Sequence, residues 1–218
     1  MKKHIVFDFD GTLVDSAEVI VKVYNELAAK YKFKKLTRKD YQVIMNLPLR
    51  KRLKALEASI FRVFVIGKIG HEFKDRYKFY LESINFFDGI IDVVRELKDK
   101  GYILSIITSN SELNINEYLD HQQINLFSHI TSSKGLFGKD QAIKNYMREH
   151  KISNKELIYI GDEVRDIKAC KRNNVEVIAV SWGLYNKEIL HSEKPNYLIE
   201  DPNEIIRIIV ATDSRSNN

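Results

Sequence analysis

The sequence predicts an α/β protein in which a Rossmann-like parallel sheet carries helices on both faces, with a helical segment inserted after the first strand. Two observations carry this prediction. From about residue 86 onward, short apolar runs typical of buried strands alternate with segments of helical periodicity, and this alternation is typical of parallel sheets. The stretch 16–85 instead shows helical periodicity, with 61–66 as the one run that could form a strand.

The elements follow one another in a regular order. Strands are expected at 4–9, 102–108, 129–132, 157–160, 175–180 and 197–199. The apolar positions of 90–97 recur at helical spacing, and Gly101 is placed to end that helix. Further helices are expected at about 139–150, 164–173 and 203–210, and Asn174 can take the left-handed position that ends the second of them. In the insert, a helical region at about 49–82 is expected to break near Gly67 and Gly70.

This pattern predicts two domains. Residues 1–15 and 86–212 would form a catalytic core, and 16–85 an inserted helical cap domain. The polar residues 213–218 would form a disordered tail. Either a monomer or a homodimer is compatible with the sequence.

Composition narrows the classes of protein. The chain is 44% hydrophobic and 30% charged, which suits a globular protein, and its single cysteine, Cys170, excludes an internal disulfide. Its first apolar stretch is too short for a signal peptide, and no apolar run reaches membrane-spanning length, so a cytoplasmic protein without membrane contact is expected.

The net charge of +5 at pH 7 fits nucleic acid or a small anionic substrate, although a lysine-rich solvated surface is the simplest interpretation. A basic run, Arg50, Lys51, Arg52 and Lys54, lies in the insert. It lacks interleaved aromatic residues, and no nucleic-acid motif accompanies it, so we expect no nucleic-acid partner. A solvated helix face is favoured, and the alternative is that Arg50 or Arg52 reaches an anionic group of the substrate.

Polar residues follow three of the predicted strands. They are Asp8-Phe9-Asp10-Gly11-Thr12, Thr108-Ser109-Asn110, and Gly161-Asp162-Glu163 with Asp166 shortly after. Ligands of open parallel sheets bind at the carboxyl ends of strands, so four or five carboxylates are expected in one crevice. Like charges at close range resist ionisation, and oxygen-only ligands favour magnesium or calcium. A lysine could neutralise further charge, and the candidates are Lys134, Lys139 and Lys144.

Four motifs in this order resemble those of the haloacid dehalogenase superfamily. The segment from Asp8 to Ser16 resembles the first motif, Thr108 the second, Lys139 the third, and the segment from Gly161 to Asp166 the acidic fourth. Together they span nearly the whole chain, which makes the resemblance specific. The helical insert between the first and second motifs resembles the cap of the phosphoglycolate phosphatase and β-phosphoglucomutase branch.

This resemblance implies a magnesium-dependent phosphatase acting on a small phosphorylated metabolite such as phosphoglycolate. Asp8 would be the nucleophile that forms an aspartyl-phosphate, and Asp10 the general acid and base. Thr108 would hold phosphoryl oxygens, and Lys139 would hold Asp8 and the phosphoryl group in register. The implied metal ligands are Asp8, Asp10, Asp162, Glu163 and Asp166. The expected substrate-binding residues are Gly11, Thr12, Ser109 and Asn110, with Arg50 of the basic run as a further candidate.

Several alternatives remain open from the sequence. Asp140 follows Lys139 where the family often has proline, so Lys134 is a rival for the third motif, although the helix start at Gly138 favours Lys139. Dehalogenases lack an acid at the position of Asp10, which argues for phosphate chemistry. A sugar phosphomutase of the same branch and a non-catalytic binding protein with the same fold are the competing functions.

Overall fold

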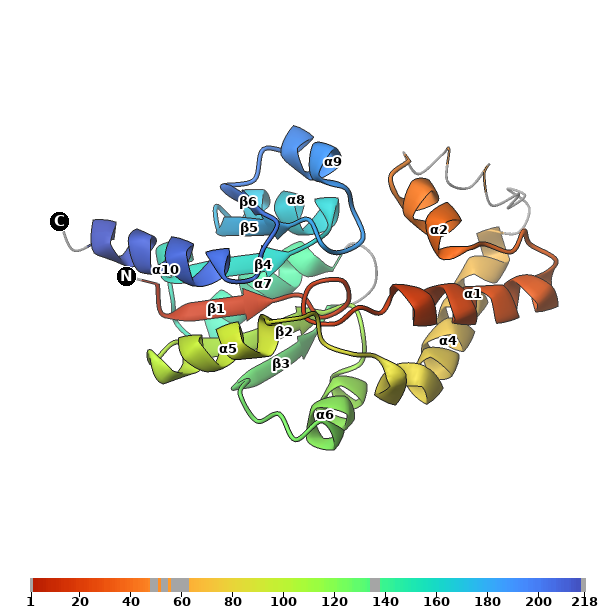
Figure 1. Cartoon of the computed structure of the whole chain (residues 1–218), viewed down its shortest axis with the longest axis horizontal. Coiled ribbons are helices and arrows are strands. Elements are labelled where there is room, and N and C mark those ends of the chain that lie inside the picture. The colour runs from red at the N-terminus through yellow and green to blue at the C-terminus, as the bar shows by residue number, and fades with distance from the viewer. Residues whose placement is uncertain (1, 48–50, 52–54, 56–62, 134–137, 217–218) are drawn as a thin grey trace. The chain divides into compact units, whose positions relative to one another are not determined.

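The computed structural model describes residues 2–47, 51, 55, 63–133 and 138–216. The chain divides into two compact units (Figure 1). Unit 1 comprises Met1–Asp15 and Asn85–Asn218, and unit 2 comprises Ser16–Ile84. Unit 2 is thus an insertion between two segments of unit 1.

Unit 1 is built on a parallel sheet. In the described part of the chain its strands are β1 (His4–Phe7), β2 (Ile103–Thr108), β3 (His129–Ser132), β4 (Leu157–Gly161), β5 (Glu176–Val180) and β6 (Tyr197–Ile199). They lie in the order β3-β2-β1-β4-β5-β6, and each pair of neighbours is parallel. The strand β1 is central, with His4 aligned to Ile103 on one side and to Leu157 on the other. The predicted parallel α/β fold is confirmed.

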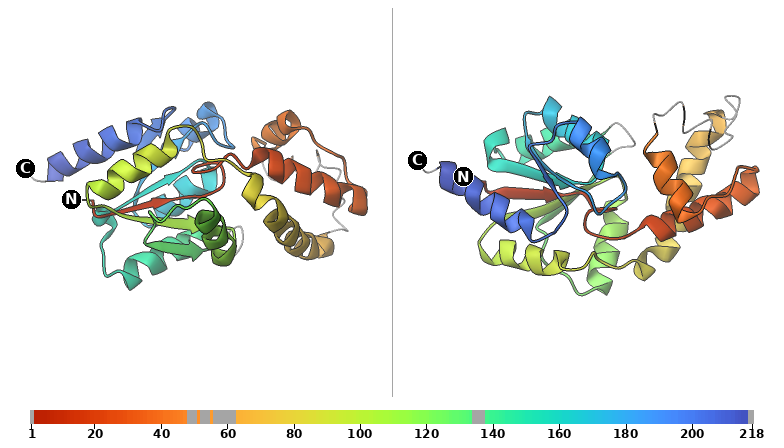
Figure 2. Two further views of the ribbon diagram at one scale, coloured as in Figure 1. Left: turned by 60° about the horizontal axis from the view of Figure 1, so that its bottom comes forward. Right: turned by 45° about the horizontal axis from the view of Figure 1, so that its top comes forward.

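Helices cover both faces of this sheet (Figure 2). They are α5 (Ile90–Asp99), α6 (Glu112–His121), α7 (Lys139–Glu149), α8 (Val164–Arg172), α9 (Lys187–Ser192) and α10 (Glu204–Ser216). In α5 the buried residues Ile90, Val93, Val94 and Leu97 recur three and four apart, so one apolar stripe faces the sheet. The central strand is buried on both sides, which explains its run of apolar residues from Ile5 to Phe7.

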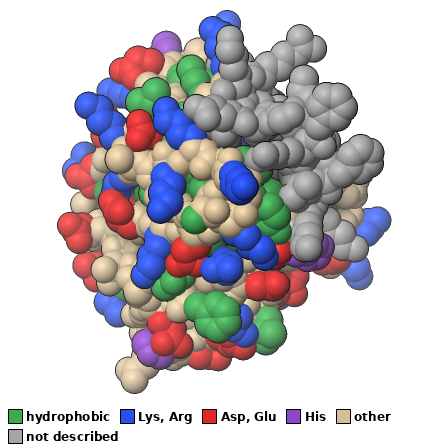
Figure 3. Space-filling view, turned by 90° about the vertical axis from the view of Figure 1, so that its right-hand side faces the viewer, with side chains coloured by type: hydrophobic (Ala, Val, Ile, Leu, Met, Phe, Trp, Pro, Cys, Tyr) green, Lys and Arg blue, Asp and Glu red, His purple; other side chains and the backbone are tan. Residues whose placement is uncertain are grey.

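Unit 2 consists of α1 (Ala17–Tyr31), α2 (Arg38–Met45), α4 (Val63–Tyr80) and a 3-10 turn at Leu81–Ser83 among its described residues. Ion pairs join α1 to α4: Lys30 lies 2.7 Å from Glu72, and Arg76 lies 2.7 Å from Glu26. On the face drawn in Figure 3, Lys and Arg side chains are interspersed with Asp and Glu. That distribution agrees with a solvated surface.

The insert differs from its prediction at two points. From Val63 onward the run 61–66 is helical and not a strand, and α4 continues through Gly67 and Gly70 without a break. An interior glycine costs a helix only about 1 kcal/mol relative to alanine. Packing of α1 against α4 and the two ion pairs between these helices favour the continuous helix.

The C-terminal helix also corrects the sequence analysis. A disordered tail was expected from residue 213, whereas α10 extends to Ser216. Asp213 accepts hydrogen bonds from the backbone N–H of Lys2, at 2.5 Å, and from the hydroxyl of Tyr102, at 2.7 Å. These contacts come from distant parts of the chain, so the local polarity of the tail does not indicate them. Among the described residues, no helix is long and apolar enough to cross a membrane.

Candidate active site

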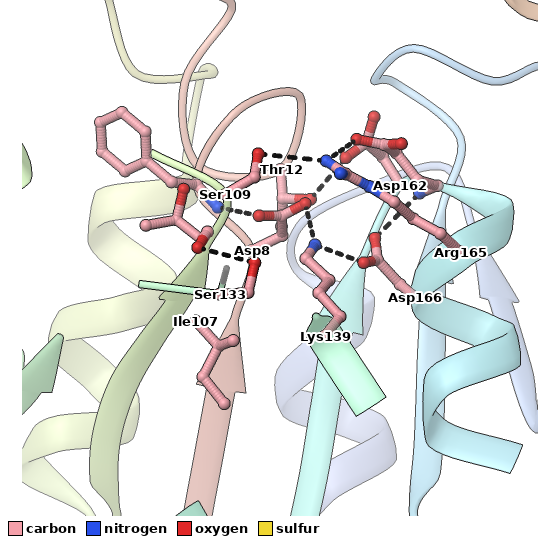
Figure 4. A network of polar contacts seen from close by, with 12 residues as sticks. Asp8, Thr12, Ile107, Ser109, Ser133, Lys139, Asp162, Arg165 and Asp166 are labelled. Carbon is pink, nitrogen blue, oxygen red and sulfur yellow. Dashed lines mark hydrogen bonds and ion pairs between the residues drawn. The ribbon is translucent and has the colours of Figure 1, made fainter. Parts of the chain in front are cut away.

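The candidate active site lies at the carboxyl ends of β1, β2 and β4, which are neighbours in the sheet. Asp8 directly follows β1, Thr108 ends β2, and Asp162 directly follows β4. Because the strands are parallel, their carboxyl ends meet at one edge, and residues far apart in the sequence lie together there (Figure 4).

Asp8 is fixed at the centre of this edge and is 1% exposed. Its backbone N–H donates to the carbonyl oxygen of Ile160 at 2.8 Å. Its Oδ1 atom accepts from the backbone N–H of Phe9 at 2.8 Å, and its Oδ2 atom lies 2.5 Å from Nζ of Lys139. Both carboxylate oxygens therefore have a donor, which sets the orientation of the carboxylate before any substrate arrives.

Lys139 begins α7 and is 3% exposed. Its ammonium contacts Asp8 and also Asp166. Burial by itself would lower the pKa of Lys139, but the charges of Asp166 and Asp8 outweigh burial and raise this pKa above its usual value. The lysine therefore stays charged at neutral pH. Lys144 is exposed, and Lys134 lies outside the described residues.

Asp8, Asp162 and Asp166 form a buried carboxylate cluster, in which one oxygen of each lies within 4.8 Å of the others. Burial, followed by the charges of Glu163 and Asp8, raises the pKa of Asp162 well above its usual value. Burial also raises the pKa of Asp166 to about 7, although the charge of Lys139 opposes this. A cation would relieve this cost of ionisation, and an all-oxygen donor set suits a hard divalent ion. The cluster could therefore hold a metal ion.

The start of α8 organises the acidic motif. Glu163 and Asp166 form a reciprocal capping box, in which the backbone N–H of Glu163 donates to Oδ2 of Asp166 at 3.1 Å. The carboxylate of Glu163, expected among the metal ligands, is also paired with Arg165, whose Nη2 lies 2.6 Å from Oε1. The sequence analysis did not single out Arg165. Its position between two acids of the fourth motif is the signal that could have indicated it.

The turn after β1 supports Asp162. Gly11 has a φ of 79°, and a Cβ there would lie 2.3 Å from Oδ2 of Asp162, so both conformation and space favour glycine. Thr12 donates its hydroxyl to Oδ1 of Asp162 at 2.9 Å. Gly11 and Thr12, expected to bind substrate, thus lie directly against this carboxylate. Asp10 is partly buried. Burial of Tyr118, followed by the charge of Asp10, raises the pKa of Tyr118.

The second motif forms a loop held by its own hydrogen bonds. Thr108 is fully buried, and its Oγ1 accepts from the backbone N–H of Asn110 at 3.0 Å. Accepting this bond uses a lone pair of the hydroxyl oxygen and leaves its proton available to be donated. The side-chain carbonyl of Asn110 accepts from the N–H of Ser111 at 2.8 Å. Ser109 lies at the edge of the site, with its Oγ 3.3 Å from Nη2 of Arg165.

The loop that follows β5 contacts the carboxylate of Asp162 through a backbone N–H of the loop. The N–H of Leu184 donates to Oδ2 of Asp162 at 2.7 Å. A Cβ at Gly183 would lie 2.4 Å from the same oxygen, so only glycine lets this loop approach. The indole N–H of Trp182 donates to the carbonyl of Thr12 at 3.1 Å. The sequence analysis missed the contribution of Leu184, because a backbone N–H has no residue signature.

The structure thus brings most of the predicted site residues together, in unit 1. Arg50 and Arg52, the alternative candidates for reaching the substrate, lie outside the described residues. The geometry places an oriented carboxylate, a charged lysine and a possible metal site side by side, and this combination suits transfer of an anionic group. The roles assigned to individual residues stay predictions.

Comparisons with known proteins agree on one family. The sequence model of the haloacid dehalogenase-like hydrolases matches residues 5–180. A phosphoglycolate phosphatase from Synechococcus elongatus is 26% identical over 207 residues, which cover 94% of this chain and 96% of that protein. A pyrophosphatase PpaX from Anoxybacillus flavithermus is 24% identical over 212 residues, with 95% and 97% covered. The crystal structure of a predicted phosphatase from Clostridium acetobutylicum has a TM-score of 0.83 at 24% identity, covering 97% of this chain and 99% of that one.

The matched region begins in β1 and ends with β5, so it contains all four motifs and the whole of unit 2. The structural similarity extends over nearly the full length of both chains. The resemblance inferred from the motifs is therefore confirmed: this chain belongs to the haloacid dehalogenase-like hydrolase family and is a hydrolase of that family.

Proposed function

We propose that the chain is a magnesium-dependent phosphatase that hydrolyses a small phosphorylated metabolite through an aspartyl-phosphate on Asp8, with phosphoglycolate as the representative substrate. The observation that carries this proposal is the carboxylate of Asp8, buried at the end of the central strand and oriented by Lys139 and by the N–H of Phe9. The names of the relatives, a phosphoglycolate phosphatase and a pyrophosphatase, support a phosphorylated substrate.

In the first step, an oxygen of Asp8 attacks phosphorus. A new O–P bond forms while the bond from phosphorus to the leaving oxygen breaks, and the leaving oxygen keeps that electron pair. Asp10 gives its proton to the leaving oxygen. The hydroxyl of Thr108 and the backbone N–H groups near Asp8 donate to the phosphoryl oxygens, and Lys139 keeps Asp8 in place.

In the second step, Asp10, now a carboxylate, takes a proton from a water molecule. The water oxygen attacks phosphorus, and the bond between phosphorus and the Asp8 oxygen breaks. Phosphate leaves and Asp8 is a carboxylate again, so the two steps balance and Asp10 ends with its proton restored.

The buried carboxylate cluster fits magnesium, because its ligands are all oxygen atoms and their ionisation is otherwise disfavoured. Asp8 and Asp162 would hold the ion directly, together with the backbone carbonyl of Asp10, and Glu163 and Asp166 would act through water or by orientation. Magnesium would supply positive charge to these carboxylates and to the phosphoryl oxygens.

The function is tested by a screen of phosphorylated metabolites with magnesium, in which free phosphate is measured. Phosphoglycolate, pyrophosphate and sugar monophosphates are the informative members, because the pyrophosphatase relatives make pyrophosphate a second candidate substrate. Isomerisation of a sugar phosphate without free phosphate would identify a phosphomutase. Absence of both reactions, with intact binding, would identify a non-catalytic protein.

We further propose that residues 16–85 act as a cap that closes over bound substrate. The two links to this segment leave unit 1 side by side: the N–H of Asp15 donates to the carbonyl of Asn85 at 2.9 Å, and Val14 pairs with Phe86. Adjacent links suit a hinge, and closure would exclude water from the phosphoryl group.

The nucleophile gives the first prediction. Replacing Asp8 with asparagine preserves shape but removes the attacking oxygen, so we expect phosphate release to fall below about a hundredth of the wild-type rate. Circular dichroism and thermal unfolding control for an intact fold. Retention of a larger fraction of activity would show that Asp8 is not the covalent nucleophile.

The metal gives the second prediction. Exhaustive chelation should abolish phosphate release, and added magnesium should restore it. Calcium should restore it poorly, because its looser coordination does not hold the in-line geometry. Full activity after chelation would contradict the proposed mechanism.

The lysine gives the third prediction. Lys139→Ala should reduce phosphate release far more than Lys134→Ala, because Lys139 is buried between Asp8 and Asp166. Removing one partner of a buried ion pair costs about 3–5 kcal/mol, so the unfolding temperature should also fall. Lys144→Ala is the matched control, since this residue is exposed on the same helix. Greater damage from Lys134→Ala would assign the third motif to Lys134.

The cap gives the fourth prediction. If it closes, small phosphorylated metabolites should be hydrolysed much faster than phosphoproteins or phosphorylated ends of nucleic acids, measured with one enzyme preparation. Equal efficiency for large and small substrates would rule out a closing cap that selects by size.

A further inference from the structure

Arg165 reaches across the candidate active site from the second position of α8. Its Nη2 atom donates to Oε1 of Glu163 at 2.6 Å and lies 3.3 Å from Oγ of Ser109 (Figure 4). Glu163 comes after β4 and Ser109 after β2, and β1 lies between these two strands. The guanidinium therefore bridges the carboxyl end of β1, where Asp8 lies.

The charges around Arg165 differ from those around a surface arginine. Its side chain is 25% exposed, and that of its partner Glu163 is 12% exposed. Asp8 and Asp166 also act on the guanidinium charge, which places it within the field of the carboxylate cluster. The positive charge of Arg165 is thus held beside the nucleophile, Asp8, and is largely shielded from solvent.

The hydrogen bonds of Arg165 are incomplete. A guanidinium has five N–H donors, and the Nε–H of Arg165 is buried without an acceptor in the described part of the protein. Native proteins seldom bury an N–H without an acceptor, because its desolvation is then not offset. The N–H donors of a guanidinium form a fork that matches two oxygens of a phosphoryl group, and these oxygens accept the hydrogen bonds. An oxygen of a phosphoryl group bound at Asp8 would supply an acceptor of this kind.

We propose that Arg165 is a further catalytic residue of this site, which donates hydrogen bonds to the oxygens of the transferring phosphoryl group and is positioned by Glu163. This inference rests on the phosphoryl transfer proposed above. Arg165 gives up no proton. Its charge offsets the charge of the phosphoryl oxygens while the bond to Asp8 forms and the bond to the leaving oxygen breaks. Glu163 then acts by orienting the guanidinium of Arg165.

The test uses Arg165→Met, Arg165→Lys and a matched control, Arg172→Met. Arg172 lies on the same helix with a 66% exposed side chain, and its Nη1 is 3.3 Å from Asp140, away from the carboxylate cluster. Binding of inorganic phosphate to the magnesium-loaded protein is measured by calorimetry. The kinetic constants kcat and KM are measured with a substrate from the screen, along with the magnesium concentration that gives half-maximal activity.

We expect Arg165→Met to weaken phosphate binding by about tenfold or more and to lower kcat/KM by about 100-fold or more. Arg165→Lys should lie between this variant and the wild type, since it keeps the charge but loses the fork. The magnesium dependence should not change, and Arg172→Met should behave as the wild type. If thermal unfolding shows that Arg165→Met is not folded, Arg165→Lys carries the comparison.

Unchanged phosphate binding in Arg165→Met, or in Arg165→Lys where the methionine variant is unfolded, would overturn the proposal. The proposal would also be overturned if Arg165→Met bound phosphate more weakly only because it bound magnesium more weakly, and if Glu163→Gln had the same effect. Arg165 and Glu163 would then only support a metal ligand. The phosphate measurement needs no turnover. If Arg165 is required for phosphate binding but no substrate releases phosphate, the proposed phosphatase function fails while Arg165 keeps its anion-binding role.

Discussion

The constraint on which this structure depends is the burial of several carboxylates at one edge of a parallel sheet. Asp8, Asp162 and Asp166 are each no more than 1% exposed, and burial together with neighbouring charge raises the pKa values of Asp162 and Asp166. Such a cluster is stable only with compensating positive charge. Lys139 provides part of it by contacting two of the three carboxylates, and a bound cation could provide the remainder.

The backbone around the cluster is shaped to hold it. Gly11, Gly161 and Gly183 lie so close to Asp162 or Asp166 that a Cβ at any of them would come within 2.4 Å of a carboxylate oxygen. Close packing of this kind leaves the acids few alternative orientations. Phosphoryl transfer depends mostly on position and charge, so a tightly held carboxylate set is the feature that the proposed reaction most needs.

We propose that the chemistry and the choice of substrate belong to different parts of the chain. All the described residues proposed to hold a phosphoryl group belong to unit 1, and they would contact the phosphoryl part that different substrates share. A phosphoglycolate phosphatase and a pyrophosphatase both align with nearly the whole chain, so relatives of this length carry the names of different substrates. Since a fold does not fix a substrate, we propose that the helical insert discriminates between them.

The sequence by itself determined the strands, most of the helices of unit 1 and the residues that end the strands, because apolar periodicity and turn residues act over short distances. It failed where distant contacts override local preference. Packing of α1 on α4 carries a helix through Gly70, and Lys2 and Tyr102 hold Asp213 in α10.

Only the tertiary structure decided how the site is assembled. The sheet order places Asp8 between the strands that carry Thr108 and Asp162, and no local pattern encodes that order. The N–H of Leu184 and the guanidinium of Arg165 became part of the site through the same ordering, because each meets its partner only when loops from non-neighbouring segments converge at the end of the sheet.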